Sequence, residues 1–240
     1  MRKTILSLLV LTVVLTIAEP IDILIPVGNY NSFDELYNAL DADPRTGNVT
    51  RISIRDSLPP LTFFQMYDCV VTDGFQTIID PVAFGDLLAD YVDGGGRVLC
   101  VFYAMMGSYG PNDCAPTGRW EAEGYCPYEC INWVCFTGYT DLIIDEPGHP
   151  VMNGVSAVDN VWARVQTSLR SGAYELAHYV DAGGVAVDED ETVIGVNYRS
   201  RDDRDWTGDG WLLLANAACW LSDYSTVRET SWGAIKARGE

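Results

Sequence analysis

The sequence predicts an α/β domain with a doubly wound, mainly parallel sheet and helices on both of its faces. Nearly continuous apolar segments are typical of strands buried on both sides, and segments with helical spacing alternate with them. This alternation implies right-handed crossovers between parallel strands. The chain has 240 residues, of which 48% are hydrophobic and 20% charged. Such a composition supports one domain with a substantial core and excludes a disordered chain.

The first predicted unit is a strand over residues 21–27, followed by a helix whose apolar side chains from 33 to 40 share one face. Residues 51–55 alternate like a second strand. The apolar run 67–72 predicts a third, buried strand that ends at Asp73. The carboxyl ends of parallel strands are where ligand loops lie in such folds.

A second helix is predicted to begin at Asp80 and Pro81, because aspartate caps a helix well and proline is tolerated at the first helical position. The glycines at 94–96 end this helix, and residues 97–103 form the fourth strand. The rest of the domain is predicted to comprise strands at 141–144, 175–180, 185–187 and 193–199, the last three antiparallel, and a closing helix at 211–221.

The N-terminus has the pattern of a secretory signal peptide. Arg2 and Lys3 precede an apolar run over residues 5–18. The alternative is an uncleaved anchor, but the run is short for a membrane span. We therefore divide the chain into a signal peptide at 1–18, a domain at 19–222 and a tail at 223–240. The protein is expected to be secreted or at the cell surface, extracellular or periplasmic.

The net charge of the chain limits the classes of partner that it is expected to bind. With 34 acidic and 15 basic residues the formal net charge is −19, which argues against binding the phosphates of nucleic acid. An anionic membrane is disfavoured for the same reason, so no membrane contact is expected after signal cleavage. No motif indicates a cofactor.

Residues 105–138 lose all periodicity and are predicted to be a long insertion after a strand. Four of the seven cysteines lie in it, at Cys114, Cys126, Cys130 and Cys135. In an exported protein we expect them to form two disulfides, in one of three connectivities. A zinc site is the weaker alternative, because the spacing lacks a Cys-x-x-Cys knuckle.

The same segment is rich in aromatic residues. Such side chains offer rigid faces for a sugar ring or another protein. The alternative is that they form a small core of the insertion itself. The candidates for an exposed binding platform are Trp120, Tyr125, Tyr128, Trp133 and Tyr139.

A short acidic loop contains Asp202, Asp203, Asp205 and Asp209. Its oxygen-rich spacing makes it a weak calcium candidate, but the closing glutamate of an EF-hand is missing. Capping of the final helix is the simpler role for Asp209.

Four segments, taken in order, resemble the class I glutamine amidotransferase-like superfamily and its trehalose-utilisation-protein-like branch. They are residues 67–73, 94–98, 148–155 and 208–220, and the resemblance covers about residues 20–222. It implies a flavodoxin-like sandwich whose functional position is the sharp turn after the strand at 97–103. The amidotransferases carry a nucleophilic cysteine at that turn.

This chain departs from that pattern. Its turn region, residues 101–104, contains no cysteine, and Cys100 lies inside the strand as an expected core thiol. The only histidines are His149, expected to fix a loop, and His178, expected to be structural within a strand. Thiol-based catalysis is therefore not expected.

The leading hypothesis is a secreted, non-catalytic domain that binds a glycan or protein partner, or assembles with itself, through the aromatic insertion. The alternative is an extracellular carbohydrate hydrolase that uses carboxylates. Asp73 and Asp113 are the candidate acids near strand ends.

Overall fold

The computed structural model describes residues 19–28, 33–74, 77–109, 114–200 and 206–222. The predicted signal peptide, the tail at 223–240, Asp113 and three of the calcium candidates (Asp202, Asp203 and Asp205) lie outside the described residues. So do the side chains of Trp133 and Cys135. Among the described helices, none combines the length and apolarity needed to cross a bilayer.

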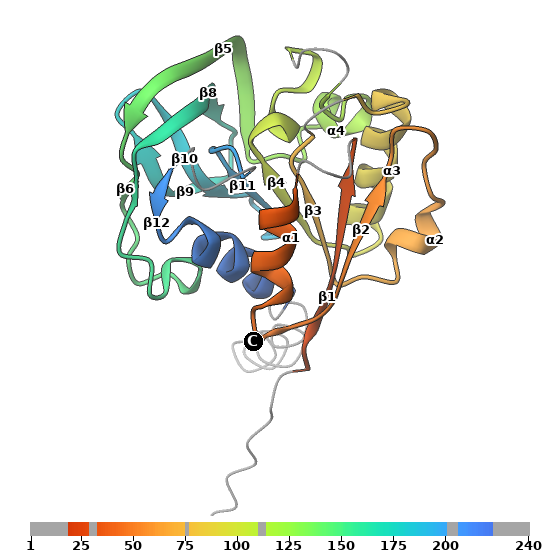
Figure 1. Ribbon diagram of the computed structural model, residues 1–240. Helices are drawn as coiled ribbons and strands as arrows, with labels where there is room; N and C mark the ends of the chain where they lie inside the picture. The colour runs from red at the N-terminus through yellow and green to blue at the C-terminus, as the bar shows by residue number, and fades with distance from the viewer. Residues whose placement is uncertain (1–18, 29–32, 75–76, 110–113, 201–205, 223–240) are drawn as a thin grey trace, which may run out of the picture.

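Within the described residues, an eight-stranded sheet forms the centre of the fold, in the order β2-β1-β3-β4-β11-β10-β9-β6 (Figure 1). The first five strands are mutually parallel, and the last three run antiparallel to their neighbours. This confirms the predicted mainly parallel sheet and the predicted antiparallel arrangement of three consecutive strands, β9, β10 and β11; the pairing of β6 with β9 is a further one. The strands are β1 Ile21–Val27, β2 Thr46–Ser53, β3 Cys69–Thr72, β4 Val98–Val101, β6 Ile143–Ile144, β9 Tyr174–Tyr179, β10 Ala182–Val187 and β11 Val193–Val196.

Helices cover both faces of the sheet, as predicted. Alternate side chains of one strand enter different cores: Ile23 and Ile25 pack into one cluster and Leu24 into the other. Asp80 caps α3 by accepting a hydrogen bond from the Ala83 N–H at 3.0 Å. The helices are α1 Asp34–Asp41 and the C-terminal helix over 210–222 on one face, and α2 Leu61–Phe64, α3 Pro81–Asp93 and α4 Arg119–Ala122 on the other.

The predicted irregular insertion contains a long strand. β5, Tyr128–Thr140, pairs antiparallel with β8, Val161–Leu169, in a two-stranded ribbon. The prediction missed this strand because three register shifts along the ribbon interrupt the alternation of side chains. Further short elements are β7 Val158–Asp159, β12 Thr207–Gly208 and 3-10 helices at Phe102–Met105, Gly107–Tyr109 and Pro150–Met152.

Asn197 fastens this ribbon to the sheet. Its side-chain amide is buried, donates to the carbonyls of Val165 (2.8 Å) and Gly183 (2.7 Å), and accepts from the Val165 N–H at 2.8 Å. One side chain thus satisfies backbone groups of both β8 and β10.

The structure does not support the predicted two-disulfide staple. Two bridges among the four insertion cysteines would need at least one pair among Cys114, Cys126 and Cys130, and none of these three is bonded to another described cysteine. Cys126 instead lies against the Cys100 thiol of β4. Pairing of β5 with β8 holds this segment in a regular ribbon instead. The described cysteines also form no cluster of three metal ligands.

Candidate functional site

The topology places a candidate site at the carboxyl ends of β1, β3 and β4. The chain crosses from β1 to β2 on one side and from β3 to β4 on the other, so β1 and β3 flank the point where the strand order reverses. Ligands of open α/β sheets bind at such points. Asp73 follows β3 at this edge, and the turn at Phe102 follows β4.

Asp73 is buried at this edge, with 3% of its surface exposed. Its Oδ2 accepts a hydrogen bond from Ser200 Oγ at 2.7 Å, while its Oδ1 has no partner among the described residues. Burial raises the pKa of Asp73 to about 6, against the opposing effects of Ser200, the Tyr103 backbone N–H and the Arg199 charge. The carboxyl group can therefore hold or release a proton near neutral pH.

The sharp turn predicted after the fourth strand is present. Phe102, the residue that follows β4, has a φ of +30° and a fully buried side chain. A bulky residue in this region is strained, at a cost of about 1–3 kcal/mol. The ring contacts Tyr103 edge-on, with 4.5 Å between centroids. Cys100 is buried inside β4 as expected, and burial raises the pKa of its thiol well above the usual value.

The predicted aromatic platform is wrong for two of its members. Trp120 and Tyr128 are only 2% and 1% exposed, because they pack into the core cluster beneath α3 and α4. They line the inner wall of a pocket of about 300 Å³ beside the 3-10 helix at Phe102–Met105. They belong to the core of the domain, together with residues of β3, β4 and α3, rather than to a separate core of the insertion. Tyr139, in contrast, is 72% exposed.

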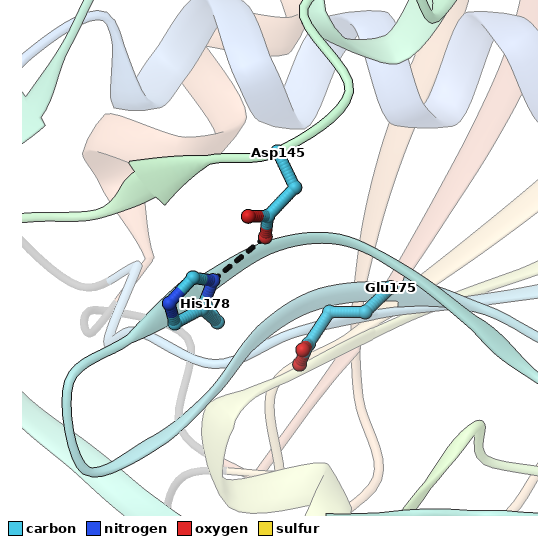
Figure 2. Close-up of side chains that lie close together, drawn as sticks. All are labelled: Asp145, Glu175 and His178. Carbon is cyan, nitrogen blue, oxygen red and sulfur yellow. Dashed lines mark hydrogen bonds and ion pairs between the residues drawn. The ribbon is translucent and has the colours of Figure 1, made fainter.

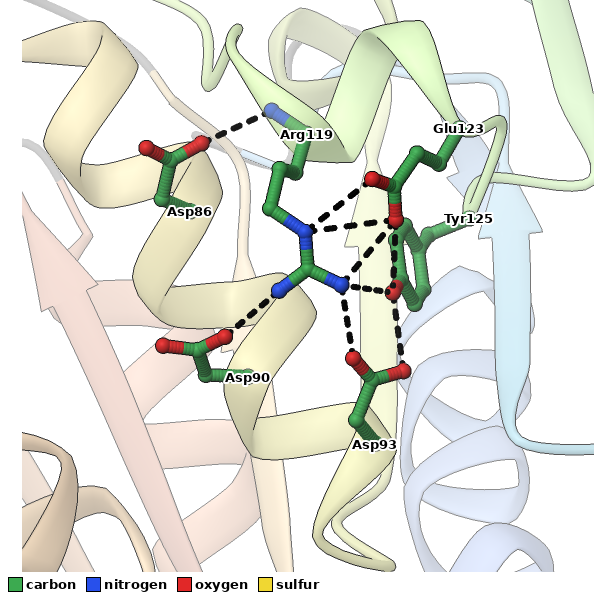
Figure 3. A network of polar contacts seen from close by, with 6 residues as sticks. All are labelled: Asp86, Asp90, Asp93, Arg119, Glu123 and Tyr125. Carbon is green, nitrogen blue, oxygen red and sulfur yellow. Dashed lines mark hydrogen bonds and ion pairs between the residues drawn. The ribbon is translucent and has the colours of Figure 1, made fainter.

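Tyr125 takes part in a network of polar contacts centred on the Arg119 guanidinium (Figure 3). The Arg119 guanidinium contacts Asp90 at 2.5 Å, Asp93 at 2.7 Å and Glu123 at 3.0 Å. The Tyr125 hydroxyl accepts from Arg119 at 2.9 Å and donates to Asp93 at 2.8 Å, while its ring stacks on Trp120. The network joins α4 to α3. The Tyr125 hydroxyl makes its hydrogen bonds with other side chains of the protein.

An exposed aromatic that the sequence analysis missed is Trp162 of β8, 36% exposed. The register places it beside Tyr139 of β5, because Thr140 pairs with Val161 and Thr137 with Ala163. The Arg199 guanidinium lies 5.1 Å from the Trp162 ring centroid, a cation–π contact. The sequence pattern that could have revealed it is the alternation of small apolar residues at 161, 163 and 165, which is typical of a strand with Trp162 on its other face.

The two histidines differ in role. His149 fixes a loop as predicted: its Nδ1 accepts from the Val151 N–H at 3.3 Å, and burial lowers its pKa. His178 is more than a strand residue. Its Nδ1 lies 2.7 Å from Asp145 Oδ2, and Glu175 lies close by (Figure 2). Sequence reasoning missed this cluster because strand pairing across 33 residues creates it.

Asp209 does not cap the final helix with its side chain. The residue stands at the capping position, where its carbonyl accepts the Leu213 N–H at 2.9 Å. The carboxylate turns away to accept the backbone N–H groups of Ser156 (2.7 Å) and Ala157 (3.2 Å). It therefore holds the preceding connector to the helix start.

Comparisons with known proteins identify the fold. No family model and no curated protein matches the sequence. Among solved structures, a cytoplasmic protein from Salmonella typhimurium is similar at a TM-score of 0.64 with 13% identity, over 85% of this chain and 98% of that one. A ThuA-like protein from Bacteroides uniformis is similar at 0.60 with 16% identity, over 86% and 93%.

The glutaminase domain of CTPS from Trypanosoma brucei is similar at a TM-score of 0.50 with 7% identity, over 82% of this chain and 93% of that one. At such identities the likeness concerns the fold alone. The chain has the fold shared by ThuA-like and glutamine amidotransferase proteins, a large and mostly parallel sheet with helices on both faces.

Proposed function

We propose that this protein is a secreted, non-catalytic domain of the amidotransferase-like fold that acts as a protein-interaction module. The observation that carries the proposal is Phe102 at the strained turn after β4, with its side chain buried. The turn that would present a nucleophile to a substrate presents an unreactive ring to the core instead.

The proposed interaction surface is the ribbon of β5 and β8. Four of its large apolar side chains are exposed: Ile131, Tyr139, Trp162 and Leu169. Aromatic residues and arginine are enriched in protein interfaces, and the cation–π pair of Trp162 and Arg199 has this character. A net charge of −19 disfavours a second copy of the chain and favours a partner with a basic surface.

The test compares Trp162→Ala and Tyr139→Ala with Met66→Ala, which removes an apolar side chain about as exposed as Tyr139, next to α2 and away from the ribbon. Binding to purified basic surface proteins of the source cell is measured by interferometry, binding to immobilised glycans on an array, and self-association by sedimentation velocity. We expect the ribbon variants to lose at least tenfold in affinity for a protein partner and Met66→Ala to lose none. Equal binding by all variants would reject the surface, and binding to glycans alone would replace the protein partner with a glycan.

A carbohydrate hydrolase is the second candidate, favoured by the raised pKa of Asp73, which suits a general acid. One arrangement weighs against it: Asp73 is 3% exposed and does not line the pocket beside Phe102–Met105. If wild type turns over any member of a glycoside panel and Asp73→Asn does not, the hydrolase displaces the interaction module.

A further inference from the structure

We propose that Asp145, Glu175 and His178 form a binding site for one divalent transition-metal ion, of which zinc is the best fit, at the edge of the sheet between β6 and β9. The three ligands lie outside β5 and β8, the strands of the proposed interaction surface. One ligand atom from each of the three side chains lies within 4.8 Å of the other two (Figure 2).

A register shift brings two of the ligands to the same face of β9. Residues three apart on a regular strand point to opposite faces. Here Ala177 pairs with Val185 and Glu175 with Ala186, so β9 holds one extra residue at Leu176. Leu176 and Ala177 both pack into the core, while Glu175 and His178 are partly exposed. Bulges that re-aim side chains in this way are common beside functional sites.

The third ligand is held opposite this bulge. β6 pairs with β9 through Ile143 and His178 and through Ile144 and Ala177, and the chain then continues to Asp145. The backbone N–H groups of Asp145 and Glu146 both donate to the Leu176 carbonyl, at 3.0 and 3.1 Å. Asp145 is therefore fixed to the bulge itself, with its Oδ2 at 2.7 Å from His178 Nδ1.

A second layer of contacts orients Glu175. The hydroxyl of buried Tyr128 donates to Glu175 Oε1 at 2.7 Å, which leaves Oε2 for a metal ion. Hydrogen-bonded carboxylates of this kind are typical of metal sites. Gly183 makes room for the pair, because a Cβ there would lie 2.3 Å from the Tyr128 ring and 2.9 Å from Glu175 Oε1.

The donor set selects the class of ion. One imidazole and two carboxylates suit Zn²⁺ and neighbouring first-row ions, whereas Ca²⁺ and Mg²⁺ prefer oxygen ligands alone. Zinc ligands in a tetrahedron lie about 3.4 Å apart, given bonds of about 2.0–2.1 Å. Asp145 Oδ2 and His178 Nδ1 lie closer than this, at 2.7 Å, so their hydrogen bond must open for both atoms to bind one ion. Rotation of these partly exposed side chains provides that movement. Three protein ligands leave the remaining positions to water.

The test titrates the full-length chain with ZnSO₄ by calorimetry, after EDTA treatment and dialysis, and with CoCl₂ by visible absorption. We expect one equivalent of Zn²⁺ to bind, and Co²⁺ to give the d–d bands of a low-coordinate site. Zinc at a hundredfold excess over its Kd should raise the midpoint of thermal unfolding by about 5–10 °C.

His178→Ala and Asp145→Asn should weaken zinc binding at least 30-fold, and Glu175→Gln, which keeps an acceptor for Tyr128, about tenfold. The matched control is Glu146→Gln, which removes a negative charge next to Asp145 and no ligand. It should change the affinity less than threefold. Circular dichroism in EDTA verifies that each variant is folded. Equal losses in Glu146→Gln and Asp145→Asn would show attraction by the acidic surface alone, and wild type without one equivalent bound at 100 µM Zn²⁺ would overturn the site.

Discussion

Replacing Asp73 by asparagine should stabilise the protein at neutral pH, although it alters a buried, hydrogen-bonded residue. Asp73 is 3% exposed, and burial raises its pKa from 3.8 to about 6. Between these pH values the folded chain keeps a proton that the unfolded chain has lost. Stability therefore falls as the pH rises from about 4 to 6, by about 3 kcal/mol, and stays at the lower level above it. Asparagine cannot ionise, and its amide oxygen can still accept from Ser200 Oγ.

The assay is urea denaturation of wild type and Asp73→Asn at pH 4, 5, 6, 7 and 8. At pH 4 the two should be within about 0.5 kcal/mol, because the carboxyl group is largely protonated in the folded state. At pH 7 the variant should be more stable by about 2–3 kcal/mol. The control, Asp56→Asn at an exposed position, should change stability by only a few tenths of a kcal/mol at each pH. A difference between Asp73→Asn and wild type that does not grow with pH would refute the reasoning.

Three other perturbations test the supporting structure. Asn197→Ala removes the side-chain partner of two buried backbone groups and one partly buried group and should cost about 3 kcal/mol in urea denaturation; a loss below 1 kcal/mol would mean that water replaces the amide. Arg119→Ala should lower the midpoint of thermal unfolding, and 1 M NaCl should shrink the difference, because the network is exposed to solvent; a salt-independent loss would point to packing instead. The thiols of Cys69 and Cys100, whose pKa values burial raises far above normal, should resist a thiol-specific reagent at pH 8 until the chain is unfolded, as peptide mapping would show. Labelling of either cysteine in the folded protein would contradict their burial.

Much of the fold could be predicted because burial leaves a local pattern. The apolar run at 21–27 and the cap and proline at Asp80 and Pro81 mark elements that the structure confirms as β1 and α3. β5 left no such pattern. Its regularity comes from hydrogen bonds to β8, and register shifts break the alternation of its side chains. The sequence around it displayed only many cysteines and aromatic residues.

The candidate site was predictable only where its residues follow a strand. Asp73 and the turn at Phe102 are next to buried strands, so topology alone places them at the carboxyl edge. The contact of Arg199 with Trp162 and the cluster around His178 depend on pairings between distant segments. No local pattern records such pairings. Exposure was no more predictable: of the candidates for the binding platform, Trp120 is buried and Tyr139 is exposed.

Two residues at the carboxyl ends of β3 and β4 lower the free energy of unfolding of this protein. The strained backbone of Phe102 costs about 1–3 kcal/mol, and the ionised Asp73 costs about 3 kcal/mol at neutral pH. Together they are a considerable fraction of the 5–15 kcal/mol that stabilises a typical domain. The Asp73→Asn variant therefore separates the two proposed functions. If the variant is more stable and still binds the protein partner, the carboxyl edge has no role in binding, and binding is confined to the ribbon. A variant that gains stability and loses turnover would mean that the ionisable carboxyl group is retained for chemistry.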